Sequence, residues 1–175
     1  MKQKGAFYMN DNITNCININ GISSAFPPCS KSFQEIQWQD ILTVSLHKPD
    51  MKQILCINST IKICKTRVID TSYGKSCEGQ RLTGKKCCVD GIVHNNIEYI
   101  SCDKTQSVHA AEFAKLFSSF IVLAREFDCN FKLNVIPYIE NIFCMQLNER
   151  DLFCSLLFTL DARPITDQIS TGRVI

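Results

Sequence analysis

Hydrophobic and polar residues alternate along most of this chain, and an alternation with a period of two predicts β-strands. In residues 53–69, QILCINSTIKICKTRVI, leucine and isoleucine take most odd positions, while polar residues take most even ones. We expect one long, half-buried strand there, or two strands joined by a bulge near Ser59. Cys56 and Cys64 would lie on its outward face.

The same period runs through residues 82–102, LTGKKCCVDGIVHNNIEYISC. Its mainly apolar parity consists of Cys87, Val89, Val93, Ile97 and Tyr99. Its mainly polar parity consists of Cys88, Asp90, His94, Glu98 and Cys102. Asn95-Asn96 resembles a hairpin turn or a bulge, and we therefore expect two strands here, after a loop at residues 70–81.

Three later segments also predict strands. FSSFIVLA, residues 117–124, is apolar enough to be covered on both faces. In residues 131–147 the apolar parity is odd and includes Phe143 and Met145, and Pro137 suggests an edge strand or a bulge. A turn at NERD, residues 148–151, leads into LFCSLLFTL. That last strand would place Leu152, Cys154, Leu156, Phe158 and Leu160 on one face.

One segment favours a helix. HAAEFAKLF, residues 109–117, contains three alanines and the pair Glu112 and Lys115, which suit a short helical turn. With eight or more strands expected, the fold class is all-β: a jelly-roll-like β-sandwich with one short helical turn. We divide the chain into an irregular N-terminal arm (1–35), a sandwich core (36–161) and a polar C-terminal tail (162–175).

Charge and hydropathy exclude several classes of function. The 175 residues have a net charge of +2 without a basic run, so we expect no nucleic-acid partner. No stretch approaches the roughly 20 apolar residues of a membrane span. The N-terminus lacks the apolar segment of a secretory signal, and we expect synthesis without a signal peptide and no membrane partner.

Eleven cysteines are unusual for a chain without an export signal. Their number is odd, so at least one thiol stays free or pairs with another molecule. No Cys-x-x-Cys pair occurs, which disfavours structural zinc. Parity makes Cys87 and Cys154 buried core thiols. The exposed candidates for disulfides between subunits are Cys16, Cys29, Cys77, Cys88, Cys102, Cys56 and Cys64.

The stretch SCDKTQSVHAAEF, residues 101–113, raises the question of catalysis because Cys102, Ser107 and His109 lie close together. A nucleophile needs a base oriented by a third group, and no GxSxG signature is present. We expect no catalytic residue, with His109 starting the helical turn and binding nearby backbone. A surface metal site of His94 with Cys88 or Cys102 is the alternative to a solvated hairpin, which we favour. We expect neither a metal nor a cofactor.

Four segments stand out together: HKPDMKQILCINSTIKICKTRVIDT (47–71), EGQRLTGKKCCVDGIVHNNIEYIS (78–101), QSVHAAEFAKLFSSFIVLA (106–124) and IPYIENIFCMQLNERDLFCSLLFTLDA (136–162). Their most specific pieces are EGQ-x-LTGKK, QSVHAA and F-S-x-FIVL, in that order. In these pieces the chain resembles the SPOCS domain, a family named as the structural protein of clostridial spores, and the resemblance covers about residues 20–162.

The resemblance implies a role in the spore envelope, meaning the coat, the exosporium or other surface layers. It implies a stand-alone subunit, since no LysM-like segment is visible. Such proteins are made in the mother-cell cytoplasm and meet oxidising conditions when that cell lyses, so thiols that are reduced during folding can form bonds afterwards. Many cysteines of this chain depart from the usual pattern of the family. They shift the expected role towards a cross-linked, self-assembling shell or filament, with other coat proteins as partners.

Three alternatives remain open at this point. The protein could be a monomeric module that docks on a coat morphogenetic protein. A carbohydrate- or peptidoglycan-binding role is weaker, because Trp38, Tyr73 and Tyr99 stand near expected outer loops without forming a cluster. For cross-linking, the sharpest expectation is that Cys16 or Cys29, on the arm, bonds a neighbouring subunit; unpaired or locally paired thiols are the alternative.

Overall fold

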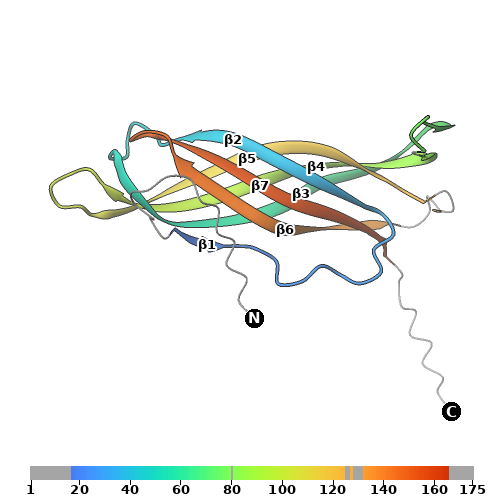
Figure 1. Ribbon diagram of the computed structural model, residues 1–175, viewed down its shortest axis with the longest axis horizontal. Coiled ribbons are helices and arrows are strands. Elements are labelled where there is room, and N and C mark those ends of the chain that lie inside the picture. The colour runs from blue at the N-terminus through green and yellow to red at the C-terminus, as the bar shows by residue number, and fades with distance from the viewer. Residues whose placement is uncertain (1–16, 80, 125–126, 128–131, 166–175) are drawn as a thin grey trace, which may run out of the picture.

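A computed structural model describes residues 17–79, 81–124, 127 and 132–165. In these residues, strands form two sheets that pack face to face (Figure 1), which confirms the predicted β-sandwich. One sheet has the order β1-β3-β4-β5 and the other has the order β2-β7-β6. The strands are β1 (Asn18–Asn20), β2 (Phe33–Thr43), β3 (Met51–Lys75), β4 (Arg81–Ser101), β5 (Val108–Val122), β6 (Leu133–Gln146) and β7 (Asp151–Pro164).

Antiparallel neighbours account for most of the pairing. β3, β4 and β5 follow one another as a meander, and β6 and β7 form a hairpin. β2 pairs antiparallel with β7, whereas the short β1 pairs parallel with β3. The central strands are therefore β3 and β4 in one sheet and β7 in the other.

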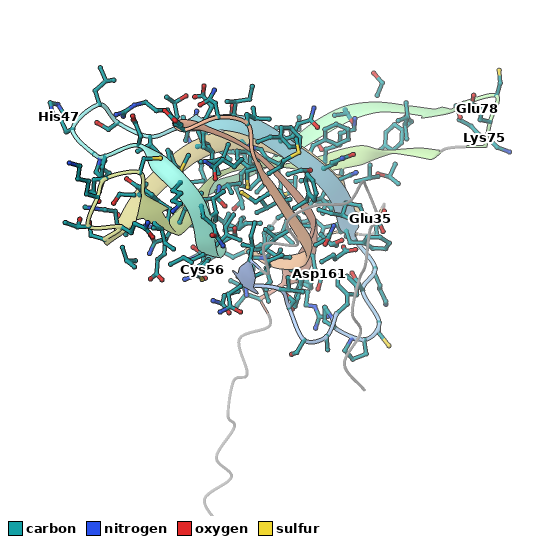
Figure 2. All side chains as sticks on the ribbon, turned by 60° about the vertical axis from the view of Figure 1, so that its left-hand side comes forward. Glu35, His47, Cys56, Lys75, Glu78 and Asp161 are labelled. Atoms are coloured by element: carbon teal, nitrogen blue, oxygen red, sulfur yellow. The ribbon has the colours of Figure 1, made fainter. Side chains whose placement is uncertain are left out.

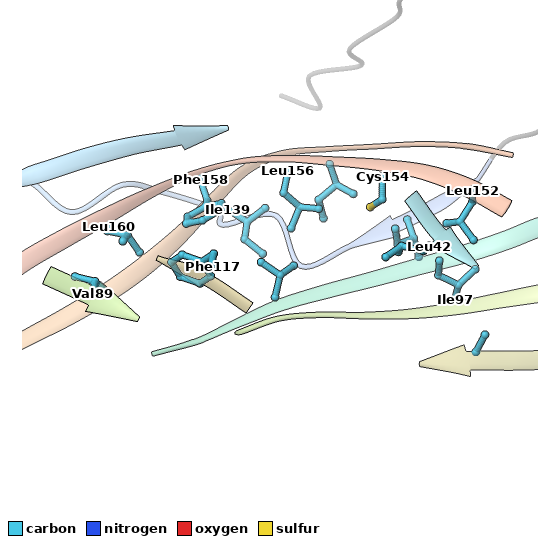
Figure 3. Close-up of a cluster of buried hydrophobic side chains, with 14 of the residues drawn as sticks. Leu42, Val89, Ile97, Phe117, Ile139, Leu152, Cys154, Leu156, Phe158 and Leu160 are labelled. Atoms are coloured by element: carbon cyan, nitrogen blue, oxygen red, sulfur yellow. The ribbon is translucent and has the colours of Figure 1, made fainter. Parts of the chain in front are cut away.

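The core lies between the sheets and is built from inward-facing side chains of strands β2 to β7 (Figure 3). The rings of Phe117 and Phe158 meet edge to face at 5.2 Å across the two sheets. Each fully buried Leu, Ile or Phe contributes about 1.5–3 kcal/mol relative to an exposed position. The inward sets predicted for residues 87–99 and 152–160 are confirmed: all of Cys87, Val89, Val93, Ile97, Tyr99, Leu152, Cys154, Leu156, Phe158 and Leu160 are 0% exposed.

The helical turn expected at residues 109–117 is wrong, because this segment belongs to β5. Its pairing with β4 runs without interruption from Val108 opposite Ile100 to Val122 opposite Lys86. Helix propensity differs by less than about 1 kcal/mol per residue among these residue types, so tertiary pairing overrides it. FSSFIVLA is covered on one face only, since Phe120 on the other face is exposed.

The turn expected at Asn95-Asn96 is also wrong. β4 continues through both residues, and Asn95 points into the core, where it is 1% exposed. Asn95 tolerates burial because its Oδ1 accepts a hydrogen bond from Ser59 Oγ at 2.6 Å. With this segment continuous, the described residues contain fewer strands than the eight or more expected.

β-Bulges alter the predicted parity in two strands. In β3 a bulge between Ile54 and Cys56 makes Ile54 the buried residue in place of Leu55. In β6 a bulge between Ile139 and Asn141 turns Ile142 inward, so that Phe143 and Met145 are exposed. β6 is an edge strand, which agrees with the position of a proline within it.

The β3–β4 hairpin extends past the end of β5. Residues 70–75 continue β3 instead of forming the expected loop, and β4 begins at Arg81. β5 pairs only as far as Lys86, so the strand segments nearer the turn have one neighbour each. Among the described residues there is no helix with the length and apolar character needed to cross a membrane.

Candidate functional site

Cys77 occupies the tip of the projecting hairpin. Figure 2 shows Lys75 and Glu78, which flank it in sequence, at the far end of this hairpin and away from the sandwich. The turn is tight because the Gly79 N–H donates to the Ser76 carbonyl at 3.0 Å and Gly79 has a φ of 90°. The Cys77 thiol is exposed and free.

Cys102 lies at the opposite end of the molecule, in the turn between β4 and β5. Its N–H donates to the carbonyl of Asp50 at 2.8 Å, which places it beside the β2–β3 connection that contains His47 (Figure 2). β4 has 21 residues and joins the two ends, and at the usual rise per residue it spans up to about 70 Å. The exposed thiols of Cys77 and Cys102 therefore cannot bond each other within one molecule.

Cys29 lies in the connection from β1 to β2, and its thiol is exposed. The next residue, Ser30, donates its hydroxyl to the buried carboxylate of Asp161, which also accepts from Arg163 Nε at 2.6 Å. This contact holds the connection against β7. Cys16, the other arm candidate, lies outside the described residues, as does Cys129.

Three further candidates lie along strands. Cys64 is exposed, and Cys56 and Cys88 are partly buried. Asn20 Nδ2 donates to the sulfur of Cys56 at 3.4 Å, so β1 partly covers this thiol. Every described cysteine is a free thiol, and whether any of them joins two subunits stays a prediction.

Cys87 and Cys154 are both fully buried. Burial raises the pKa of the Cys87 thiol, with a smaller contribution from the adjacent Cys88. Cys154 has a partner that the sequence analysis did not single out: Cys144, directly opposite it in the β6–β7 hairpin. A hydrogen bond between the two thiols, together with burial, raises the pKa of Cys154.

Ser107 and His109 do meet, as Ser107 Oγ lies 3.0 Å from His109 Nε2. The expectation that His109 starts a helical turn and binds backbone is wrong, because it lies in β5 and contacts a side chain. Ser107 continues into a network with Ser101 at 3.3 Å, and Ser101 donates to Asp103 Oδ1 at 2.7 Å.

This network can stabilise the β4–β5 turn. The carboxylate of Asp103 accepts hydrogen bonds from Ser101 and Thr105. Both bonds lower the pKa of Asp103, and the bond from Ser101 has the larger effect. These bonds engage the acid with hydroxyl groups of the turn instead of with the imidazole of His109, which a Ser-His-Asp arrangement would require. The geometry is that of a hydrogen-bonded turn beside the thiol of Cys102.

The surface metal alternative does not fit the structure. His94 and Cys88 lie on β4 six residues apart, a separation of about 20 Å along a strand, and Cys102 follows the strand eight residues beyond His94. Within the residues that the structure describes, no three His, Cys, Asp or Glu side chains gather in a way that could hold a metal ion.

The aromatic residues weighed for carbohydrate binding lie apart. Tyr99 is fully buried and donates its hydroxyl to the Pro49 carbonyl at 3.0 Å, and burial raises its pKa. Trp38 packs against the core, so only Tyr73 is largely exposed. Tyr99 does lie beside a connecting segment, but it is buried; the expectation of a position near an outer loop is wrong for Trp38, which lies in the middle of β2.

A comparison with known protein families shows which family the chain belongs to. The family model described as SipL, SPOCS domain matches residues 50–147, just over half of the chain. The chain belongs to the SPOCS domain family. Searches of the curated proteins and of the solved structures each found no match. The matched part of the SPOCS domain includes Cys77 and Cys102, and membership in the family points to a role in sporulation.

Proposed function

We propose that this SPOCS domain is a structural subunit of the spore surface that self-assembles into a disulfide-cross-linked layer or filament of the coat, the exosporium or an appendage. The observation that carries the proposal is the position of two exposed thiols, Cys77 and Cys102, in the connections at opposite ends of the long strand β4. The subunit has no enzymatic role, and the Ser107–His109 pair acts by stabilising the turn that presents Cys102.

A bond between the two ends of adjacent subunits is a head-to-tail contact. Contacts of this type produce open arrays unless the rotation between copies closes a ring. Cys29, exposed at the base of the β1–β2 connection, offers a further link to a neighbouring copy. A layer or a filament follows from such links without a further change in the fold.

Open strand edges supply the non-covalent part of the assembly. β5 and β6 are outer strands of their sheets, as are β1 and β2, and each has backbone groups along one side that no neighbouring strand pairs. Adding a strand of a neighbouring copy to such an edge satisfies those groups. β5 suits this role better, because β6 contains Pro137, which lacks a backbone donor.

Timing of the cross-links follows from the redox compartment. We place synthesis in the mother-cell cytoplasm, where thiols stay reduced, and deposition on the spore surface with other coat proteins. Disulfides then form once lysis exposes the assembled thiols to oxidants.

A purified protein tests the proposal directly. Wild type, oxidised with glutathione disulfide, should give a ladder of oligomers on non-reducing gels and ordered assemblies by electron microscopy, both removed by dithiothreitol. The double variant C77S/C102S, oxidised in the same way, should form no ladder. A matched double variant, C56S/C64S, removes two thiols from the middle of β3 and should behave as wild type.

Two outcomes would contradict this expectation. Persistent monomers of the oxidised wild type would favour the alternative, a monomeric module that docks on a coat morphogenetic protein. A ladder that survives in C77S/C102S but disappears in C56S/C64S would show that the disulfides form between strand faces and not between the ends of the subunits.

A further inference from the structure

The β6–β7 hairpin sets two cysteines directly opposite each other. Its turn is closed by the Leu147 N–H, which donates to the Asp151 carbonyl at 2.8 Å. Hydrogen-bonded and non-hydrogen-bonded pairs alternate along an antiparallel ladder. Three steps from the Leu147–Asp151 pair, Cys144 and Cys154 therefore form a non-hydrogen-bonded pair.

Pairing on the other side of β7 agrees with this assignment. The Ala162 N–H donates to the Ser32 carbonyl, and the Val44 N–H donates to the Arg150 carbonyl. Even-numbered residues of β7 thus direct their backbone groups to β2, which leaves Cys154 without a backbone bond to β6. In such pairs the two Cα atoms are about 4.5 Å apart, inside the range of roughly 4.4–6.8 Å that disulfides require.

The two side chains share the inner face but differ in access. Cys154 is 0% exposed, whereas Cys144 lies on the edge strand β6, packs against the core and is only partly buried. A small oxidant can therefore reach Cys144 first. A hydrogen bond with Cys154 lowers the pKa of Cys144, which favours its thiolate as the attacking group.

We propose that Cys144 and Cys154 are a dithiol redox site that forms a reversible intramolecular disulfide on reaction with a low-molecular-weight disulfide such as oxidised glutathione. This site is independent of the links between subunits proposed above, since both of its sulfurs belong to one hairpin.

The reaction proceeds by two thiol–disulfide exchanges. The Cys144 thiolate attacks one sulfur of the oxidant, and the other sulfur leaves as a thiolate that takes up a proton. Cys154 then loses its proton and attacks the Cys144 sulfur, which expels the second small thiolate. Two protein thiols are oxidised to one disulfide, and one small disulfide is reduced to two thiols.

Peptide mapping gives an unambiguous readout, because trypsin cleaves after Arg150, between the two cysteines. The resulting peptides are residues 133–150 and residues 151–173, because Pro164 protects the bond after Arg163 from cleavage. Each peptide contains one cysteine. After treatment of the reduced full-length protein with glutathione disulfide, non-reduced digests should contain these two peptides joined. Dithiothreitol should separate them, and the joined pair should persist in protein diluted enough to remain monomeric.

Two variants separate the roles of the thiols. In C154A the resolving thiol is absent, so glutathione should remain attached to Cys144 in a stable mixed disulfide. In C144S the buried Cys154 should stay unmodified while the exposed Cys77 is glutathionylated. Persistence of separate, unmodified peptides in the oxidised wild type, with Cys77 modified in the same sample, would overturn the proposal.

Failure of this inference can be distinguished from failure of the proposed function. Cross-linking between subunits is measured by the oligomer ladder and should be retained in C144S. A ladder that depends on Cys144 would show that this thiol bonds another copy instead of Cys154, and would contradict the intramolecular site.

Discussion

Ser59 and Asn95 form a polar pair inside an otherwise apolar core. They lie opposite each other on β3 and β4, both are almost fully buried, and Ser59 Oγ donates to Asn95 Oδ1 at 2.6 Å. Asn95 Nδ2 has no partner among the described residues, so the amide already bears part of a desolvation cost. This pair should make single and double substitutions behave differently.

We expect S59A to lower the free energy of unfolding by about 1–3 kcal/mol, because it removes the main donor to Asn95 Oδ1. The double variant S59A/N95V should recover most of this loss, since it removes both buried polar groups and places a β-branched residue in a strand. Urea unfolding of the three proteins measures the difference. A double variant less stable than S59A would contradict the assignment of Asn95 as a costly buried amide.

At the scale of the element, close packing between β4 and β5 depends on a glycine. Gly91 is opposite Phe117, and a Cβ built on it would lie 2.5 Å from the Phe117 ring and 2.8 Å from the Lys62 carbonyl oxygen. G91A should therefore destabilise the protein by about 1–3 kcal/mol, because the ring and a backbone atom must both move. G74A, on the projecting hairpin where a Cβ meets only a side-chain atom of Leu82 at 3.4 Å, is the matched control and should change stability by less than about 0.5 kcal/mol. Thermal unfolding that ranks the two variants equally would contradict this explanation.

The strands differ in how far alternation predicts them. β4 and β7 are central strands without an extra residue, so one parity holds along each and their inward sets are predicted correctly. The extra residues of the bulges lie on β3 and β6, and each one moves the following side chains to the other face. Alternation alone does not indicate where an extra residue is inserted.

The bulge on β6 also explains why the cysteine pair was missed. Counting parity from Phe131 through Phe143 places Cys144 on the outer face, away from the inward Cys154. The bulge after Ile139 returns Cys144 to the inner face. The exposure of Cys77 follows from its place in a connecting segment, which lies at the surface, and that of Cys102 is predicted by its place on the polar parity of residues 82–102. Their separation at opposite ends of the molecule depends on β4 being continuous through Asn95, which the sequence does not indicate.

At the scale of the whole molecule, the tip of the β3–β4 hairpin should be separable from the sandwich. No side chain described for residues 75–79 belongs to the core, and the backbone of Lys75 pairs with that of Arg81 within the hairpin. Replacing residues 75–81 with Asn-Gly would join Gly74 to Leu82, which are already paired, through a two-residue turn suited to antiparallel strands. The shortened protein should retain its Tm, since the buried apolar surface is unchanged, but should lose oxidative end-to-end assembly because Cys77 is removed.

C77S in the full-length hairpin is the control that separates loss of the thiol from loss of the projection. If C77S still forms ordered arrays without covalent links while the shortened protein forms none, the hairpin itself contacts the neighbouring subunit and the disulfide only locks that contact. If both proteins assemble as wild type does, the tip has no part in joining the subunits and the end-to-end arrangement is wrong.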